Sequence, residues 1–330
     1  VTGGLGYIGS HTSVLLLEKG YDLVIVDDLS NSNEKVIENI SQITSKVPVF
    51  EKIDLKDKES VSKLFNNYDF DGIIHFAAHK SVNESVNYPD KYFKNNVGSL
   101  ENIIYEIQKL NKPMNFIFSS SCTVYGQADS MPINEGFELK KAESPYGQSK
   151  RKCEEILENF HKAGHNFKNI TLRYFNPIGA HPTSLIGELP IGIPENLVPY
   201  ITQTAVGKRD HLTVFGDDYD TNDGTCIRDY IHIMDLAEVH ITCLEKLMNI
   251  KDDSFFNVYN VGTGKGTSVL ELINLFENVN QLKLNYKVGK RRDGDVVIAY
   301  ADTSKIKNEL NWTTKYSLET VSYTHLRAHE

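Results

Sequence analysis

Cysteine is scarce in this sequence, and the four cysteines among its 330 residues lie far apart, at positions 122, 153, 226 and 243. They form no Cys-x-x-Cys pair, and no His-x-x-x-His pair among the eleven histidines has acidic residues on both sides. Disulfide frameworks and zinc sites are built from such clusters. We therefore expect no metal site, and reduced thiols in a reducing compartment, the cytoplasm.

Long hydrophobic runs and excess positive charge are also missing. No apolar run reaches the roughly 18 residues of a membrane-spanning helix. The formal net charge of -9 argues against a nucleic-acid partner or an anionic membrane surface, but leaves room for a local basic pocket. The hydrophobic fraction of 40% and the charged fraction of 24% are ordinary for a globular protein with one large domain or two smaller ones.

A glycine-rich turn opens the chain, with Gly3, Gly6 and Gly9 at three-residue spacing before a helical pattern over residues 10–19. Glycines let a backbone approach a pyrophosphate closely, and the following helix N-terminus faces the anion. The next strand, residues 23–26, ends at Asp27, where an acid would hold a ribose hydroxyl and repel a 2′-phosphate. Either feature alone is common in strand turns, but together they predict NAD rather than NADP.

Strand and helix patterns alternate through the first half of the chain. The expected strands are residues 47–53, 72–78, 116–121 and 171–176, and the expected helices include 92–110 and 145–164. Continuous apolar strands between helices are typical of a doubly wound parallel α/β sheet of the Rossmann type. After residue 176 the pattern becomes irregular, and we expect a smaller α/β substrate-binding region on the C-terminal side.

Both ends of the sequence interrupt this pattern. Only Val1 and Thr2 precede the first glycine, whereas a central strand needs about five residues, so we expect a truncated first strand. Residues 322–330 show no periodicity and are interpreted as a non-native tail. The predicted organisation is an NAD-binding domain over 1–176, a mainly substrate-binding region over 177–321 with segments returning to the first domain, and that tail.

The helix expected over residues 145–164 carries Tyr146 and Lys150 four positions apart, hence on one face. Ser144 is a suitable N-cap and Pro145 a suitable first residue. The same face continues through Cys153, Leu157 and Phe160, so it points inward. A phenol that fills the core beside a lysine that reaches solvent is the simpler interpretation of the pair alone. Doubly wound sheets bind their ligands at the carboxyl ends of the strands. Because polar residues are expected at those ends, we favour a functional interpretation of the Tyr146–Lys150 pair.

Several motifs are similar to those of the extended short-chain dehydrogenase/reductase family: Thr-Gly-Gly-x-Gly-Tyr-Ile-Gly over residues 2–9, Ser-Ser-Ser-Cys-Thr-Val-Tyr-Gly over 119–126, and Tyr146-x-x-x-Lys150. Residues 172–182, 224–235 and 291–295 resemble, more specifically, the family's NAD-dependent sugar-nucleotide 4-epimerases that act on UDP-glucose. The resemblance runs from residue 1 to about residue 320.

This resemblance implies the site residues. It implies a catalytic group of Ser121, Tyr146 and Lys150. It implies NAD contacts from Gly3, Gly6, Tyr7, Ile8, Gly9, Asp27, Asn31, Ser32, Asp54, Phe76, Ala77, Lys80, Asn95 and Phe175. It implies UDP-sugar contacts from Asn176, Asn196, Leu197, Thr213, Phe215, Arg228, Arg292, Asp295 and Ala299. The alternative for the arginines is a solvated salt-bridge cluster with the neighbouring aspartates.

The implied reaction interconverts UDP-glucose and UDP-galactose through a 4-keto sugar. Tyr146 would take the C4 hydroxyl proton, assisted by Ser121, while NAD accepts and returns the hydride. We expect the Lys150 ammonium and the positive nicotinamide ring to lower the pKa of Tyr146 by roughly three units, which corresponds to about 4 kcal/mol. A small Ala299 would also admit N-acetylated UDP-sugars. The resemblance further implies a homodimer, formed through helices near 92–110 and 146–164.

Alternative functions can be compared with the residues present at individual positions of the sequence. Sugar-nucleotide dehydratases of this superfamily carry an Asp-Glu pair just after the serine strand, where this chain has Cys122-Thr123. A uronate epimerase or a decarboxylase stays open from the residues alone. A non-catalytic nucleotide sensor is disfavoured, because such proteins usually lose the Tyr or the Lys and both are present here.

Overall fold

The structure is a computed structural model, which describes residues 1–188, 194, 196–292 and 295–320. The expected tail over 322–330 lies outside the described residues. The chain divides into two compact units, each of which is described by itself below. Unit 1 comprises Val1–Gln127, Glu138–Tyr174 and Ala237–Tyr259, and unit 2 comprises Ala128–Phe137, Phe175–Leu236 and Asn260–Glu330.

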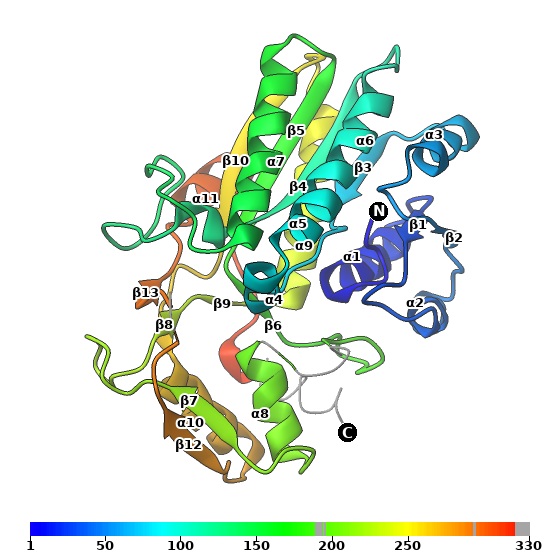
Figure 1. The fold of residues 1–330 in the computed structure, drawn as a ribbon. Helices are drawn as coiled ribbons and strands as arrows, with labels where there is room; N and C mark the ends of the chain where they lie inside the picture. Colours follow the sequence, from blue (N-terminus) through cyan, green and yellow to red (C-terminus); the bar gives the residue numbers. More distant parts are fainter. Residues whose placement is uncertain (189–193, 195, 293–294, 321–330) are drawn as a thin grey trace. The chain divides into compact units, whose positions relative to one another are not determined.

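Unit 1 is built on a twisted sheet (Figure 1). Its strands are β1 (Val24–Asp27), β2 (Val49–Lys52), β3 (Gly72–His75), β4 (Met114–Ser121), β5 (Phe167–Tyr174) and β10 (Phe255–Val261). The pairs β1–β2, β3–β4 and β4–β5 are parallel, and β10 lies beside β5. Thr2 bridges to both Val26 and His75, so the first residues occupy the position between β1 and β3. The predicted doubly wound parallel sheet is confirmed.

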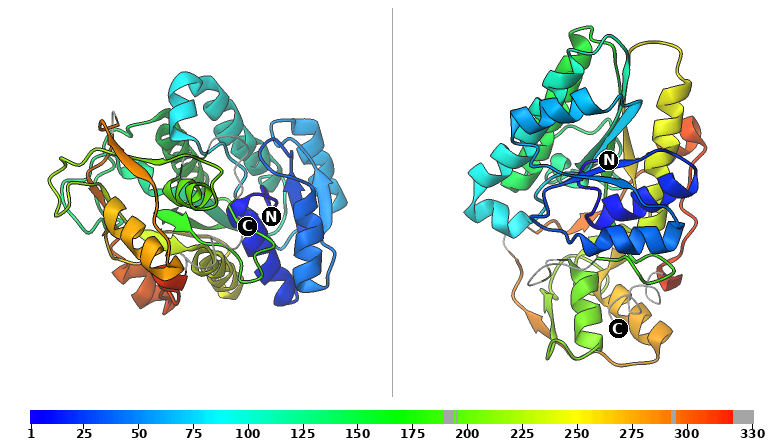
Figure 2. Two further views of the ribbon diagram at one scale, coloured as in Figure 1. Left: turned by 90° about the horizontal axis from the view of Figure 1, so that it is seen from below. Right: turned by 90° about the vertical axis from the view of Figure 1, so that its right-hand side faces the viewer.

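The helices of unit 1 cover both faces of this sheet. They are α1 (Tyr7–Glu18), α2 (Lys35–Thr44), α3 (Lys58–Asn67), α4 (Val82–Asn87), α5 (Pro89–Tyr92), the π-helical turn η1 (Phe93–Val97), α6 (Gly98–Ile107), the 3₁₀ turn η2 (Cys122–Tyr125), α7 (Pro145–Lys162) and most of α9 (Ile233–Asn249). In the right-hand view of Figure 2, α6 and α7 lie on one face of the sheet and α9 on the other.

Local sequence explains where these helices begin. The Ser144 hydroxyl accepts a hydrogen bond from the Gly147 amide and Pro145 is the first residue of α7, which confirms the predicted N-terminus. The helix predicted over residues 92–110 contains the π-helical turn η1 and ends at Ile107. The C-terminal boundary predicted for the strand over residues 171–176 was wrong. Strand β5 ends at Tyr174, and Asn176 begins a separate strand in unit 2.

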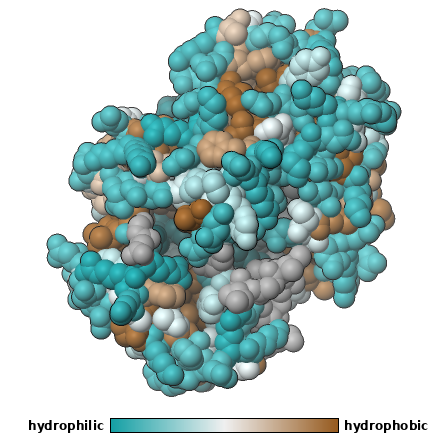
Figure 3. All heavy atoms as spheres, in the orientation of Figure 1, coloured by the Kyte–Doolittle hydropathy of each residue, from teal (hydrophilic) through white to brown (hydrophobic). Residues whose placement is uncertain are grey.

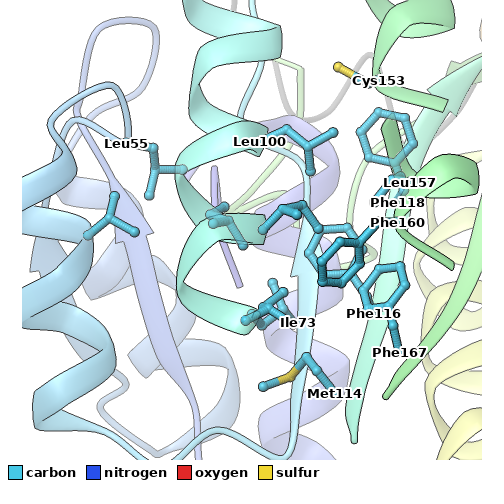
Figure 4. Packing of buried hydrophobic residues seen from close by; sticks show 14 of the residues in the cluster. Leu55, Ile73, Leu100, Met114, Phe116, Phe118, Cys153, Leu157, Phe160 and Phe167 are labelled. Atoms are coloured by element: carbon cyan, nitrogen blue, oxygen red, sulfur yellow. The ribbon is translucent and has the colours of Figure 1, made fainter. Parts of the chain in front are cut away.

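The core of unit 1 lies between the sheet and the helices α6 and α7. Cys153, Leu157 and Phe160 of α7 are buried, which confirms the inward face predicted for this helix. Figure 4 shows them close to Phe116 and Phe118 of β4. Apolar burial of this kind is the main source of the free energy of folding. This packing therefore holds α7, which carries Tyr146, against β4, which carries Ser121.

Unit 2 consists of short strands and helices, as the irregular sequence after residue 176 predicts. They are β6 (Asn176–Ile178), α8 (Leu197–Ala205), β7 (Leu212–Phe215), β8 (Ile227–Arg228), β9 (Tyr230–His232), β11 (Thr267–Ser268), α10 (Val269–Asn280), β12 (Tyr286–Gly289), β13 (Ile298–Ala299) and α11 (Ser304–Leu310). Strand β7 pairs with β12, β6 with β9, and β8 with both β11 and β13. Ile201, Ile273 and Phe276 are among the residues of its core.

The surface shown in Figure 3 is mostly hydrophilic, and apolar side chains form only small separate patches on this face. Among the helices that the structure describes, none is both long enough and apolar enough to cross a lipid bilayer.

Candidate active site

The glycine turn of unit 1 has the geometry of an anion-binding loop. Gly3 has a φ of +64°, and a Cβ atom there would lie 2.7 Å from the Ala77 backbone nitrogen. A Cβ atom on Gly9 would lie 2.2 Å from the Gly3 carbonyl oxygen. Helix α1 begins at Tyr7, and its N-cap, Gly6, makes no side-chain capping bond. The amide groups of the first turn therefore face outward from a tight backbone, which suits a pyrophosphate.

Asp27 lies at the end of β1, next to this turn. Its carboxylate accepts hydrogen bonds from the Leu5 amide at 3.1 Å, the Leu29 amide at 3.0 Å and the Ser32 hydroxyl at 2.7 Å. The structure thus brings Asp27 and Ser32 to the glycine turn. Asn31 and Asp54 are exposed in the loops that follow β1 and β2. A buried carboxylate beside an anion-binding turn fits a dinucleotide with free ribose hydroxyls.

The loop that follows β3 is linked to helix α7 by one amide side chain. Phe76 and Ala77 follow β3 directly, and Lys80 is exposed in the same loop. Asn96, in η1, donates hydrogen bonds of 3.0 Å to the His79 carbonyl and to the Ser149 hydroxyl of α7. The predicted Asn95 precedes it, and its side-chain oxygen accepts a hydrogen bond from Lys56 at 3.3 Å. A π-helical turn at a functional site is a recurrent arrangement.

Ser121, Tyr146 and Lys150 come together at the carboxyl end of β4. The Ser121 hydroxyl lies close enough to the Tyr146 phenol to lower its pKa in part, and Tyr146 is partly buried. Lys150 is only 3% exposed. Its ammonium donates to the Ser119 carbonyl at 2.7 Å and lies 5.0 Å from the centre of the Phe118 ring. The simpler interpretation, a lysine that reaches solvent, is therefore wrong.

The expected lowering of the Tyr146 pKa is not seen in this structure. Burial raises the pKa of Tyr146 to about 12, and the nearby Ser121 hydroxyl opposes this shift only in part. Burial also lowers the pKa of Lys150 to about 8. Both shifts favour the neutral forms, because a low-dielectric site penalises charge. The residues that surround the phenol in this structure therefore raise its pKa rather than lower it.

In unit 2, the predicted UDP-sugar residues form two pairs. Arg228, on β8, forms an ion pair with Asp295 at 2.9 Å. The Arg292 guanidinium lies 3.9 Å from the centre of the Phe215 ring, which is 38% exposed on β7. The salt bridge that the alternative interpretation expects is thus present for Arg228. A guanidinium stacked on an aromatic ring and the second guanidinium of Arg228 are also groups that suit a nucleoside diphosphate.

The remaining predicted residues of unit 2 lie on its strands and at one helix start. Ala299, on β13, is the direct partner of Arg228 on β8. Asn176, on β6, donates its backbone amide to the Asp229 carbonyl at 2.9 Å, and Phe175 donates to the Val261 carbonyl at 3.1 Å. Asn196 is the N-cap of α8, and Leu197 is the first residue of that helix. Thr213 lies on the same side of β7 as Phe215.

Sequence reasoning missed the buried polar residues that support these groups. Glu154 lies four positions after Lys150 on α7 and pairs with Arg173 on β5, and both are buried. In unit 2, the buried Asp229 accepts hydrogen bonds from Thr263, Gly264 and Ala301. A signal for Glu154 was available, because an acid on an inward helix face needs a buried partner.

Comparisons with known proteins were made for the whole chain. A family model described as GDP-mannose 4,6 dehydratase matches residues 1–324. UDP-glucose 4-epimerase of Bacillus subtilis is 47% identical over 319 residues, which cover 97% of this chain and 93% of the relative.

Two solved structures are similar over nearly the same length. UDP-glucose 4-epimerase of Stenotrophomonas maltophila, with bound NAD and formylated UDP-arabinopyranose, has a TM-score of 0.95 at 41% identity, covering 99% of this chain and 96% of that one. The UDP-Glc/GlcNAc 4-epimerase of Campylobacter jejuni has a TM-score of 0.83 at 37% identity, covering 99% and 97%.

Proposed function

This chain belongs to the UDP-glucose 4-epimerase family, and from that premise we propose that it interconverts UDP-glucose and UDP-galactose on bound NAD. The observation that carries the proposal is the similarity over 97% of the chain to an epimerase. The proximity of the Ser121 hydroxyl to Tyr146, with Lys150 buried one turn further along α7, supports it. We assign proton transfer and cofactor binding, apart from the contact of Phe175, to residues of unit 1, and UDP binding to residues of unit 2.

NAD fits the glycine turn and Asp27, and when bound it supplies a hydride acceptor and donor for C4 of the hexose. The amides of Tyr7, Ile8 and Gly9 would hold its pyrophosphate, as helix N-termini do. The Asp27 carboxylate would accept from a ribose hydroxyl and repel a 2′-phosphate, which favours NAD over NADP. The further NAD contacts are assigned to Asn31, Ser32, Asp54, Phe76, Ala77, Lys80, Asn95 and Phe175.

Tyr146 is assigned the proton transfer at the C4 oxygen. Its phenolate would remove the hydroxyl proton as C4 is oxidised, and its phenol would return a proton when the ketone is reduced from the other face. Ser121 would hydrogen-bond the same oxygen. Lys150, which holds the Ser119 carbonyl, would add positive charge near the phenolate.

UDP binding is assigned mainly to Arg228, Arg292 and Phe215, with further contacts from Asn176, Asn196, Leu197, Thr213 and Asp295. The Arg228–Asp295 ion pair must open, at least in part, for the guanidinium to bind a diphosphate. Replacement of Arg228 by Met should therefore raise the KM for UDP-galactose about 10- to 100-fold, since a charge-assisted hydrogen bond contributes about 1.5–3 kcal/mol.

Steady-state kinetics at several UDP-galactose concentrations measure this effect. The matched control is Arg209→Met, because Arg209 stacks on Tyr200 and donates to Gln203 away from the assigned residues. An unchanged KM in Arg228→Met, with a normal melting temperature, would remove Arg228 from the assignment.

The direct test of the proposed function is to supply UDP-galactose to the purified protein without added cofactor and to analyse the product. We expect UDP-glucose, with NAD released from the denatured protein at about one molecule per chain. A 4-keto-6-deoxy sugar would indicate a dehydratase instead, the reaction named in the family model's description. We do not expect that product, because Cys122-Thr123 stand where dehydratases carry an Asp-Glu pair.

We also propose that the enzyme accepts UDP-N-acetylglucosamine, because the small Ala299 is the strand partner of Arg228. The next residue, Tyr300, points to the other side of the strand, where its ring lies against Gly266. The similar Campylobacter jejuni enzyme is named for both substrates.

The Ala299→Tyr variant should keep most of its activity on UDP-galactose and lose about tenfold or more on the N-acetylated sugar, since an added ring fills the space of the acetyl group. Assays of both substrates measure the ratio, and Ala299→Ser, which stays small, is the control. A wild type that does not turn over the acetylated sugar would contradict the proposal.

The cellular location and assembly are proposals as well. All four cysteines are free, three of them buried, which supports a cytoplasmic enzyme. We propose a homodimer through the helices near residues 92–110 and 146–164, as the family resemblance implies, and the exposed Phe93 and Tyr105 lie in the first of these segments. Light scattering of the purified protein would test the dimer, and a monomeric mass would refute it.

A further inference from the structure

Helix α7 contacts three successive residues of strand β4 through a single stripe of side chains. Tyr146, Lys150 and Glu154 follow at four-residue intervals and so lie on one face of the helix. Tyr146 lies near the Ser121 hydroxyl, which affects its pKa, and Lys150 donates to the Ser119 carbonyl at 2.7 Å. Glu154 accepts a hydrogen bond from the Ser120 hydroxyl, between the other two.

Glu154 is in turn held by Arg173 on the neighbouring strand β5. The Arg173 Nε lies 3.0 and 3.2 Å from the two carboxylate oxygens, and one terminal nitrogen lies 2.5 Å from Oε2. Arg173 is the direct strand partner of Ser120. Arg173, Glu154 and Ser120 are all buried. The pair is therefore fixed between one helix and two strands.

Arg173 also reaches the segment on the other side of Ser121. Its second terminal nitrogen donates to the Tyr125 hydroxyl at 3.0 Å, and the guanidinium carbon lies 4.9 Å from the centre of the Tyr125 ring. Tyr125 ends the η2 turn, which begins directly after Ser121. The residue before Ser121 is thus held through Glu154, and the turn after it is held through Tyr125.

Stability alone does not account for such a pair. Desolvation of two buried charges is costly, and apolar residues of similar volume often stabilise a fold equally well. The pair does supply direction, because a guanidinium fork and a carboxylate have fixed planar geometry. A shift of about 1 Å in a reacting group is enough to reduce a rate strongly.

We infer that Glu154 and Arg173 are positioning residues, which hold Ser121 opposite Tyr146 for the reaction assigned above. This inference rests on the proposed function, since it concerns the same three catalytic groups. Neither residue touches the substrate in this scheme. Their effect should therefore appear in kcat and leave the KM for the UDP-sugar and the amount of bound NAD unchanged.

The test is the double variant Glu154→Met/Arg173→Met, which removes both charges and leaves neither one unpaired. We expect a melting temperature within a few degrees of the wild type, a kcat reduced about 10- to 100-fold, and a KM within about twofold. A purely structural pair would give full activity in any double variant that is as stable as the wild type.

The matched control on the same helix is Lys152→Ala/Glu155→Ala, an exposed ion pair whose loss should leave kcat unchanged. If the first double variant does not fold, Ser120→Ala decides, since it removes only the hydroxyl that joins Glu154 to β4. We expect a kcat reduction of about 3- to 10-fold in that variant.

The outcomes separate the two proposals. A wild type without epimerase activity overturns the proposed function and the inference with it. An active wild type with a stable and fully active double variant, or with an unchanged Ser120→Ala variant, overturns the inference alone.

Discussion

Turnover of UDP-galactose by the Tyr146→Phe variant should be about 10³-fold lower than that of the wild type, with NAD still bound. A positioned general base typically contributes about 10²- to 10⁴-fold to a rate, and the phenol is the group assigned to the C4 oxygen. The ring itself packs near Tyr92, so the substitution removes one oxygen and little apolar contact.

Measurements of kcat and of NAD released on denaturation check this result. The control is Tyr92→Phe, because the Tyr92 hydroxyl hydrogen-bonds Glu84 and its loss should change kcat by no more than about threefold. On the acidic side of its pH profile, the wild type should gain activity as the pH rises, since only the phenolate accepts a proton. Near-normal turnover by Tyr146→Phe would remove the tyrosine from its assigned role.

Replacement of Gly9 by alanine, which adds a single methyl group, should abolish the binding of NAD. A Cβ atom there would lie 2.2 Å from the Gly3 carbonyl oxygen, a backbone atom that cannot rotate away as a flexible side chain would. The Gly9→Ala variant should therefore contain almost no NAD, and its free energy of unfolding should fall by more than about 3 kcal/mol. The glycine turn and helix α1 must separate to admit the methyl group, which disrupts the proposed pyrophosphate site.

The NAD content and the melting temperature of the purified variant measure both effects. Gly98→Ala is the matched control, because Gly98 has a helical φ of −61° and open space where a Cβ atom would lie. That change should be neutral or slightly stabilising. A Gly9→Ala variant with a full content of NAD would contradict the assignment of the glycine turn.

Much of unit 1 could be predicted from the sequence because its elements carry local signals. Ser144 and Pro145 indicated the start of α7, and the spacing of Cys153, Leu157 and Phe160 indicated its buried face. Strand ends in a parallel sheet share one edge, so Asp27 and Ser121 were expected at that edge from chain order alone. The glycine spacing likewise indicated the tight turn before α1.

What could not be predicted depends on contacts between distant residues. The π-helical turn η1 has no local signal that we recognised, and Asn96 acquires its role only when His79 and Ser149 lie beside it. The pKa of Tyr146 depends on how deeply its ring is buried, whereas the charges of Lys150 and of the nicotinamide ring were expected to dominate. In unit 2, short strands such as β8 and β13 are defined by their pairing rather than by their own sequence.

If Arg228 binds the diphosphate as proposed, its ion pair with Asp295 would make recognition of UDP an exchange of one anionic partner for another. The net free energy of association is then the difference between a diphosphate and a carboxylate contact, much smaller than either alone. The substrate and the product of the proposed reaction carry the same UDP group. Weaker binding of UDP is then an advantage, since tight binding would slow the release of both UDP-sugars. Under the proposed assignment, Asp295 would thereby shorten the residence time of UDP on the two arginines.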